Sequence, residues 1–327
     1  MSTKPLNWSL LSTARINRSL IPPLRESKRN HLLAVASRSQ ETADTYARHW
    51  KIPRAHGSYE ALLADPEIDV VYNSLPNHLH AEWTIKAVEA GKHVLCEKPL
   101  ALSVEEVDAI AAAAQKYGRV VTEAFMYRHH SQTLKVQEIV KSGSLGTLKL
   151  LRGSFSYVMK QEGNIRSDPM MGGGSLWDVG CYPISYMRAV LGAEPVEVFG
   201  WQVTGPTGID ETFVGQLRFA EGVYGQFDSS FVIPFHVYME FVGSEGTLII
   251  PNPYKPDLNE KIFLVRDGKT ETIKVKGQEL YLGEVEDMAD AILSGKAPRI
   301  SLEDSHVNVA VIAALLESAR KNAPVKI

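Results

Sequence analysis

A glutamate, a lysine and a proline end one of the buried, strand-like runs of the chain. The run is KHVLCEKP (92–99), and Lys98 stands directly before Pro99. Ligands bind at the carboxyl ends of the strands in an open α/β sheet. The proline restricts the backbone at Lys98 and makes a cis bond a candidate there. We therefore predict that Lys98 acts on a bound substrate, the alternative being a surface lysine at a strand end.

A second candidate lies in GGGSLWDVGCYPISY (172–186), where a glycine-rich turn precedes a predicted helix. Asp178 and Tyr182 are four residues apart, so on an α-helix they share one face. Oxidation of an alcohol by hydride transfer needs a base, and an unperturbed tyrosine titrates near ~10. A neighbouring ammonium group lowers that pKa. We therefore predict Lys98 and Tyr182 as an acid–base pair, with Asp178 and, less strongly, Arg166 as substrate contacts; taken alone, Tyr182 fits a core tyrosine better.

Histidines do not form a metal-binding pattern in this sequence. His78 and His80 in PNHLH lack further ligands at the spacing of a metal site, and so do His129 and His130. We predict no metal. The loop that carries PNHLH follows a buried strand, and we expect it to contact the cofactor or the substrate.

Strands and helices alternate in the first part of the chain. Buried strand-like runs are predicted at 8–11, 31–37, 68–76, 92–99 and 119–125, with helix-like segments between them. This alternation predicts a doubly wound parallel sheet, the Rossmann arrangement, covered on both faces by helices.

The pattern of predicted helices and strands changes near residue 123. A predicted helix at 131–143 is followed by strand-like runs with short turns, typical of a predominantly antiparallel sheet, and helices at 282–293 and 302–321 end the chain. We predict an α/β domain over 1–123 that binds NAD(P) and an α+β domain over 124–327 that binds substrate.

The turn after the first strand lacks the glycines of a dinucleotide-binding fingerprint, since no glycine precedes Gly57. Ser12, Ala14 and Asn17 stand at the fingerprint positions, and all are small or modest in size. The backbone could still approach a phosphate there. The alternative is an ordinary capped turn between a strand and a helix.

We expect Ser12 and Thr13 to cap the helix that follows, whose free N–H groups attract anions, and Pro22–Pro23 to interrupt or kink it. After the second strand the sequence has Arg38 and no acid, which favours NADP over NAD because arginine pairs with a 2′-phosphate. A loop arginine facing solvent is the alternative. The predicted cofactor contacts are Ser12, Thr13, Ala14, Arg15, Ile16, Ser37, Arg38, Ser74, Leu75, Asn77, His80, Glu97 and Lys98.

Bulk properties exclude several classes of protein. The 327 residues carry a formal net charge of -3 and no basic run, so nothing favours a nucleic-acid partner. No apolar run approaches the roughly 20 residues of a membrane span, and the first residues do not resemble a signal peptide. We expect a cytoplasmic enzyme.

The motifs together resemble the Gfo/Idh/MocA oxidoreductase family along essentially the whole chain. The matching segments are SYEALLADPEIDVVYNSLPNHLHAEWTIKAVEAGKHVLCEKPLAL, GGGSLWDVGCYP, VGSEGTL and SARKN. The resemblance implies an open C-terminal sheet, oxidation or reduction of sugars, polyols or cyclic diols, and a homodimer or homotetramer that pairs through that sheet. The family often has histidine at the position of Tyr182. A tyrosine there resembles the branch that contains dihydrodiol dehydrogenase and NADP-dependent D-xylose dehydrogenase.

Two other functions stay open at this point. One is a glycoside-cleaving enzyme that uses transient oxidation with a recycled nucleotide, although such relatives often carry export signals and this chain shows none. The other is a sensor of nucleotide or sugar without catalysis. The joint presence of Lys98, Asp178 and Tyr182 argues against a sensor, because pure binding needs no acid–base pair.

Overall fold

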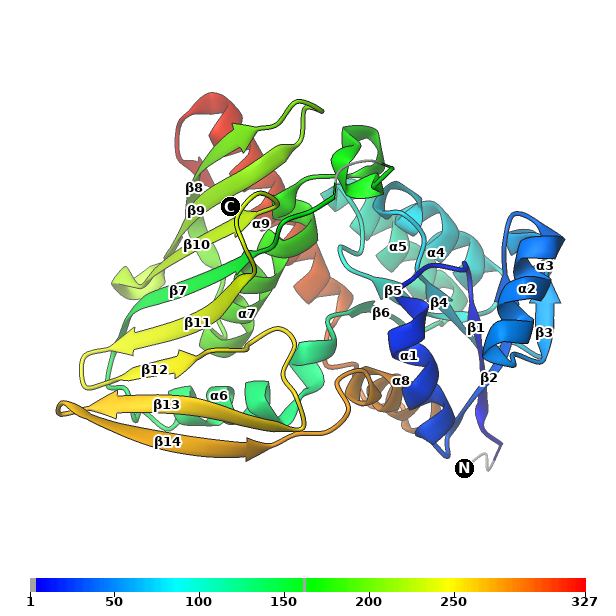
Figure 1. Cartoon of the computed structure of the whole chain (residues 1–327), viewed down its shortest axis with the longest axis horizontal. Coiled ribbons are helices and arrows are strands. Elements are labelled where there is room, and N and C mark those ends of the chain that lie inside the picture. Colours follow the sequence, from blue (N-terminus) through cyan, green and yellow to red (C-terminus); the bar gives the residue numbers. More distant parts are fainter. Residues whose placement is uncertain (1–3, 161–162) are drawn as a thin grey trace. The chain divides into compact units, whose positions relative to one another are not determined.

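The structure, a computed structural model, describes residues 4–160 and 163–327. The chain forms two compact units (Figure 1). The first runs to Met126 and also includes Tyr281–His306, and the second comprises Tyr127–Leu280 and Val307–Ile327. A late segment thus returns to the first unit. The nucleotide-binding and substrate-binding roles given to 1–123 and 124–327 stay predictions.

The first unit is built on a six-stranded sheet in the order β3-β2-β1-β4-β5-β6. Every pairing between neighbouring strands is parallel, and the strand order reverses between β1 and β4, which confirms the predicted Rossmann arrangement. The prediction missed the edge strand β3, whose residues are only half-buried and form no apolar run. The strands are β1 (Leu6–Leu10), β2 (Asn30–Ala36), β3 (Arg54–His56), β4 (Val70–Asn73), β5 (His93–Glu97) and β6 (Val121–Ala124).

Helices cover both faces of this sheet (Figure 1). They are α1 (Asn17–Glu26), α2 (Gln40–Trp50), α3 (Tyr59–Leu63), α4 (His80–Glu89), α5 (Val104–Tyr117) and α8 (Leu282–Ser294). Met288 of α8 belongs to the same buried cluster as Trp8 of β1 and Leu20 of α1. The late segment therefore completes the core of the first unit.

Helix α1 differs from its prediction in two ways. Pro22 and Pro23 lie inside the helix and do not interrupt it, because its buried face packs into the core and this packing outweighs the lost backbone hydrogen bonds. The N-cap is Ile16, without a side-chain hydrogen bond. Ser12 and Thr13 therefore do not cap the helix, which begins too far along the chain for them to reach.

The second unit holds a nine-stranded sheet in the order β14-β13-β12-β11-β7-β10-β9-β8-β15. Its neighbouring strands are antiparallel except for β7 and β10, so the predicted, predominantly antiparallel sheet is confirmed. The strands are β7 (Leu148–Ser156), β8 (Pro195–Thr204), β9 (Asp210–Phe219), β10 (Tyr224–Ser230), β11 (His236–Gly243), β12 (Thr247–Ile250), β13 (Asn259–Arg266), β14 (Lys269–Lys276) and β15 (Val325–Lys326).

Three helices pack against this sheet: α6 (Ser131–Lys141), α7 (Cys181–Leu191) and α9 (Leu302–Lys321). The Ser131 hydroxyl donates to the backbone carbonyl of Lys276 in β14 at 2.8 Å. Ser318 of α9 accepts a hydrogen bond from the N–H of Gly200 in β8 at 3.1 Å. The other face of β8 and β9 carries exposed apolar side chains.

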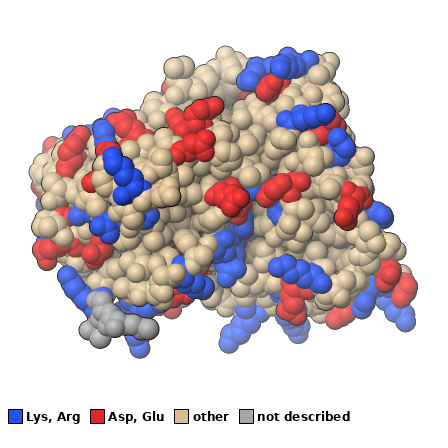
Figure 2. Space-filling view, turned by 180° about the vertical axis from the view of Figure 1, so that it is seen from behind, with Lys and Arg blue, Asp and Glu red and all other residues tan. Residues whose placement is uncertain are grey.

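No helix within residues 4–160 and 163–327 is long and apolar enough to cross a membrane. The same residues contain no group of three or more His, Cys, Asp or Glu side chains that could hold a metal ion. Positive and negative side chains are interspersed over the face that Figure 2 shows.

Candidate active site

The carboxyl ends of β1 and β4 meet where the strand order reverses, the place where doubly wound sheets bind nucleotides. Ser12 and Ser74 follow these strands, and their hydroxyl oxygens lie 2.9 Å apart. The Ser74 hydroxyl also donates to Asn17 Oδ1 at 2.7 Å. The Asn17 amide donates to the Ser12 carbonyl at 2.6 Å. Hydrogen bonds among three buried side chains thus close the turn that glycines shape in the usual fingerprint.

This turn offers backbone donors to an anion. The N–H of Ala14 donates to the Ser12 hydroxyl at 3.1 Å. Across the described residues, the N–H groups of Thr13, Arg15 and Ile16 donate to no other protein group. They precede α1, and the Arg15 side chain beside them is exposed. The turn fits a phosphate on this ground, because free N–H groups at a helix start attract negative charge.

Lys98 follows β5 and is half-buried, and its bond to Pro99 is cis. Two buried side chains hold the turn that contains it. His80 Nδ1 lies 2.7 Å from the Pro99 carbonyl oxygen, and Glu123 accepts a hydrogen bond from the N–H of Leu100 at 2.9 Å. The backbone at Lys98 is therefore fixed from two sides.

His80 also ties this turn to the loop after β4. The side chain is only 1% exposed, and its Nε2 lies 2.7 Å from the Leu75 carbonyl oxygen. Burial lowers the pKa of His80, and the two backbone contacts act in the opposite sense. Its observed contacts are structural, and a contact with the cofactor stays a prediction.

The remaining predicted cofactor contacts also lie in the first unit. Arg38 is exposed after β2, and its charge interacts with Tyr59. Glu97 accepts a hydrogen bond from the buried hydroxyl of Tyr72. Ser37 and Asn77 are half-buried, the former donating its N–H to a carbonyl of β3. No acidic side chain stands at the end of β2, as the sequence indicated.

Asp178 and Tyr182 lie where a π-helical segment, η5 (Leu176–Gly180), leads into α7. The expectation of one α-helix is wrong for Asp178, because a π-segment winds more residues into each turn. Gly180 ends η5 in close packing: a Cβ there would lie 2.8 Å from a methyl carbon of Leu176. A π-helical segment depends on packing, so the periodicity of the sequence does not reveal it.

Two side chains from other segments converge on Asp178. Its Oδ2 accepts a hydrogen bond from the Tyr157 hydroxyl at 2.9 Å and lies 2.9 Å from Nε of Arg166. The charge of Asp178 raises the pKa of Arg166, whereas burial, followed by the charge of Asp178, raises the pKa of Tyr157. Sequence reasoning identified Arg166 and missed Tyr157, which lies just beyond β7 without any motif around it.

Tyr182 is buried among aromatic rings. Its ring centroid lies 5.2 Å from that of Phe155 and 5.5 Å from that of Tyr254. Tyr182 also contributes, after Asp178 and Tyr157, to the raised pKa of Arg166. Arg166 therefore interacts with both predicted residues, Asp178 of η5 and Tyr182 of α7. Lys98 belongs to the first unit, and its pairing with Tyr182 stays a prediction.

The glycine-rich turn before η5 holds the backbone of Arg166. The N–H of Gly174 donates to the Arg166 carbonyl at 3.0 Å. A Cβ at Gly173 would lie 2.4 Å from the same oxygen, so this close approach needs glycine. The turn thus joins Arg166 to the segment that carries Asp178.

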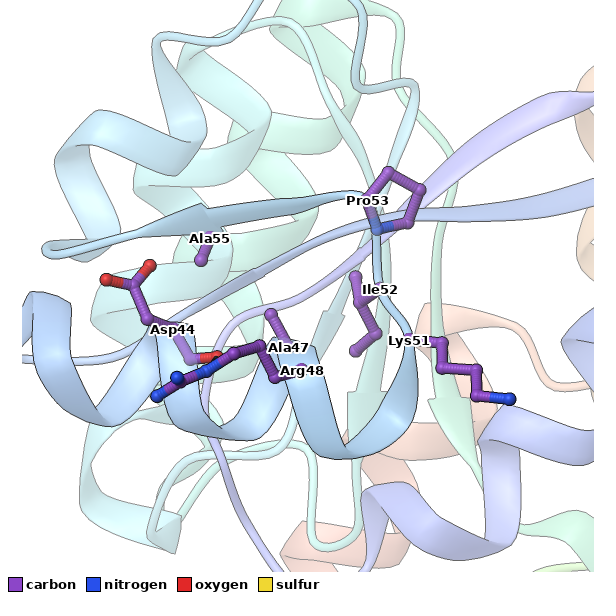
Figure 3. A pocket seen from close by; sticks show the side chains of 7 residues that line it. All are labelled: Asp44, Ala47, Arg48, Lys51, Ile52, Pro53 and Ala55. Atoms are coloured by element: carbon purple, nitrogen blue, oxygen red, sulfur yellow. Dashed lines mark hydrogen bonds between the residues drawn. The ribbon is translucent and has the colours of Figure 1, made fainter.

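A hollow of about 500 Å³ lies elsewhere in the first unit, between α2 and β3 (Figure 3). Asp44, Arg48, Lys51 and Ile52 are among the residues around it. The connection from α2 to the start of β3 lies at the amino ends of the strands. Because ligands of doubly wound sheets bind at the carboxyl ends, we assign no role in cofactor binding to this hollow.

Family models match both parts of the chain. Residues 8–125 match the Gfo/Idh/MocA oxidoreductase family with an NAD-binding Rossmann fold, and residues 133–249 match the Gfo/Idh/MocA C-terminal domain. The chain belongs to the Gfo/Idh/MocA family. It is an NAD(P)-dependent oxidoreductase, and the resemblance seen in its sequence is confirmed.

Relatives within the Gfo/Idh/MocA family carry related names. A D-xylose 1-dehydrogenase (NADP(+)) of Haloferax volcanii is 36% identical over 98% of this chain and 99% of its own. A trans-1,2-dihydrobenzene-1,2-diol dehydrogenase of Xenopus laevis is 29% identical, covering 97% and 98%. The crystal structure of a 3-ketoreductase from Actinomadura kijaniata with NADP and TDP-benzene superposes with a TM-score of 0.91, at 29% identity, over 96% of this chain and 98% of that one.

Proposed function

We propose that this protein is an NADP-preferring dehydrogenase or reductase of an aldose or a cyclic diol, with Lys98 and Tyr182 as its acid–base groups. The observation that carries the proposal is the group formed by Asp178, Arg166 and Tyr182, in a chain whose family binds nicotinamide nucleotides. The names of the xylose and dihydrodiol relatives support these two substrate classes.

Each polar group has one role in this proposal. NADP, when bound, supplies or accepts the hydride. Tyr182 takes the hydroxyl proton during oxidation and returns it during reduction, and the ammonium group of Lys98 favours its phenolate form. Asp178, held by Tyr157 and Arg166, accepts a hydrogen bond from a substrate hydroxyl. The exposed part of Arg166 contacts another substrate oxygen.

A substrate screen tests the reaction class. Purified protein is incubated with NADP⁺ and a panel of aldoses, polyols and cyclic diols, and absorbance of the reduced nicotinamide is followed. We expect turnover with at least one aldose or cyclic diol. Absence of turnover across the panel, in both directions and with both nucleotides, would refute the proposal.

Arg38→Ala is expected to weaken NADPH binding roughly tenfold or more and to leave NADH binding unchanged, because a charge-assisted hydrogen bond to the 2′-phosphate is lost. Fluorescence titration of both nucleotides measures the two affinities. Arg48→Ala, which removes an arginine from α2, is the matched control and should retain the preference for NADPH. Equal affinities of the unmodified protein for the two nucleotides would contradict the assignment of Arg38.

We also propose that the chain forms a homodimer or homotetramer through its C-terminal sheet. Trp201 and Val203 of β8 are 50% and 61% exposed, and Val214 of β9 stands opposite Trp201 on the same face. Apolar side chains gathered on one sheet face favour a protein partner, and a second copy satisfies each of them symmetrically.

Trp201→Asp is expected to convert the oligomer into monomer at micromolar concentration, because a carboxylate would be buried without a partner at the interface. Size-exclusion chromatography with light scattering measures the mass. Leu258→Asp, a change at an apolar residue exposed in a loop before β13, should leave the mass unchanged. A monomeric unmodified protein would disprove the proposed assembly.

A further inference from the structure

Asp210, the first residue of β9, is a buried carboxylate with no part in the mechanism above. It is 5% exposed and lies within the second unit. Its Oδ2 accepts a hydrogen bond from the N–H of Leu176 at 2.7 Å and another from the Ser175 hydroxyl at 2.8 Å. Leu176 begins η5. The carboxylate therefore binds the free N–H end of the segment that carries Asp178, where negative charge is favourable.

A β-bulge directs Asp210 to this place. In the pairing of β8 with β9, Val203 lies opposite Thr212 and Thr204 opposite Asp210, so Glu211 is an extra residue. In a regular strand Asp210 would share the open face of the sheet with Thr212. The bulge reverses the alternation and turns the carboxylate toward the helix-covered face.

The same carboxylate packs against the glycine-rich turn. Gly174 has a φ of 118°, and a Cβ there would lie 2.1 Å from Asp210 Oδ1. The carbonyl of Gly174 accepts the N–H of Asp178 at 3.1 Å, and its N–H donates to the carbonyl of Arg166 at 3.0 Å. Through one glycine, Asp210 thus supports the backbone positions of both Asp178 and Arg166.

Burial raises the pKa of Asp210 to about 6. Because this pKa lies above that of the unfolded chain, stability is greatest with the carboxyl protonated and falls as pH rises through about 6. Near pH 7 the group is charged, and burial of this charge lowers the stability of the folded chain, although the hydrogen bonds from Leu176 and Ser175 act in the opposite sense on the pKa of Asp210. Charged side chains on neighbouring elements include Asp178 of η5, Asp228 of β10, Glu211 of β9, and Arg166 and Asp168 in the segment beside the turn.

We propose that Asp210 is a positioning residue of the active site. Through its hydrogen bonds to Leu176 and Ser175 it fixes the Gly172–Ser175 turn and the start of η5, and so sets where Asp178, Arg166 and Tyr182 meet the substrate. This inference rests on the proposed function for its effect on catalysis. Its effect on the order of the turn can be measured without any substrate.

Asp210→Asn tests the inference, with Glu211→Gln as the matched control on the same bulge. Asparagine keeps the size of the side chain and one acceptor oxygen, but its neutral amide accepts more weakly than a carboxylate from the N–H of Leu176 and the Ser175 hydroxyl. We expect amide hydrogen exchange over residues 173–182 to become faster in the variant, and to be unchanged in the control. In the unmodified protein, protection of these amides should decrease as pH rises through about 6, because ionisation of the buried carboxyl disfavours the ordered turn, and this step should be absent in the variant.

Kinetics on the full enzyme supply the second readout. We expect Asp210→Asn to reduce kcat/KM for the substrate by up to ~100-fold, because small displacements of reacting groups slow the reaction strongly. NADPH affinity should stay within about twofold, since the proposed nucleotide contacts lie in the other unit.

The outcomes separate the two proposals. Unchanged exchange in the variant would disprove the role of Asp210, even if the unmodified enzyme is active. Altered exchange with unchanged kcat and KM would show a purely structural carboxylate and also overturn the inference. If no substrate is turned over by the unmodified protein, the proposed function fails and exchange alone decides the ordering role. If the variant does not fold, the pH-dependent protection of the unmodified protein decides it.

Discussion

Tyr182→Phe is expected to lower the turnover number by ~10²-fold to ~10⁴-fold, the range that general acid–base catalysis contributes. The change removes only the hydroxyl group. The ring keeps its packing against Phe155 and Tyr254, so we expect an intact fold and unchanged affinity for NADPH. In the proposed mechanism, loss of the phenol leaves the substrate hydroxyl without a group to take its proton while the hydride leaves. Steady-state rates with a substrate from the screen, and fluorescence titration of NADPH, measure both quantities.

Tyr186→Phe is the matched control for this experiment. Tyr186 lies one turn further along α7, is fully buried, and stacks on Tyr127 with ring centroids 5.3 Å apart. The same chemical change at this place should leave the turnover number within about twofold of the unmodified enzyme, because a hydroxyl remote from the reacting atoms does not contribute. A Tyr182→Phe enzyme as fast as the unmodified one would exclude proton transfer by Tyr182.

Lys98→Met is expected to lower kcat/KM by at least ~10²-fold, through loss of the cation that we propose favours the phenolate and binds the substrate oxygen. Methionine has a similar length and carries no charge. The turn that holds Lys98 should persist, since His80 and Glu123 bind its backbone at Pro99 and Leu100. Thermal unfolding should therefore change little. In the oxidation direction, the rise of the rate with pH should move to higher pH, because without the cation the Tyr182 phenol loses its proton less readily.

Two comparisons keep this result specific to Lys98. Lys116→Met removes a lysine from the exposed end of α5 and should leave kcat/KM unchanged. Lys98→Arg retains the positive charge and should recover part of the lost rate. A Lys98→Met enzyme with full activity, or a loss matched by Lys116→Met, would contradict the role given to Lys98.

The double variant Lys98→Met, Tyr182→Phe tests whether the two groups act as a unit. Groups that carry out one proton transfer show strongly non-additive effects, so the double variant should be about as slow as the slower single variant. A loss of rate in the double variant equal to the product of the two single losses would instead show that the two groups act independently. This cycle tests the proposed pairing of Lys98 with Tyr182.

Local patterning alone was enough to predict much of the fold. The strands of the first unit are continuous apolar runs between turn residues, and such runs indicate parallel strands buried on both faces. The position of Lys98 followed from the same pattern, since the residues after a parallel strand lie at the ligand-binding edge. These predictions succeed because hydrophobic periodicity and turn chemistry belong to short stretches of chain.

Helix α1 and segment η5 show where local reasoning fails. Pro22 and Pro23 predict an interruption that the packing of α1 overrides, and an Asp-x₃-Tyr spacing predicts an α-turn where the chain forms a π-helical one. The turn without glycines is a third case. Asn17 stands at a position where the usual fingerprint has glycine. Its hydrogen-bond partner Ser74 is 57 residues away, and no local signal connects the two.

By itself, then, the sequence determined the two kinds of sheet, the family, and the identity of Lys98, Asp178 and Tyr182 as candidates. The tertiary structure alone decided that Tyr157 and Arg166 hold Asp178, and that a bulge turns Asp210 toward the start of η5. The physical reason is that these partners come from separate segments. Their meeting depends on register, burial and packing of the whole unit, and none of these is encoded in a short stretch of residues.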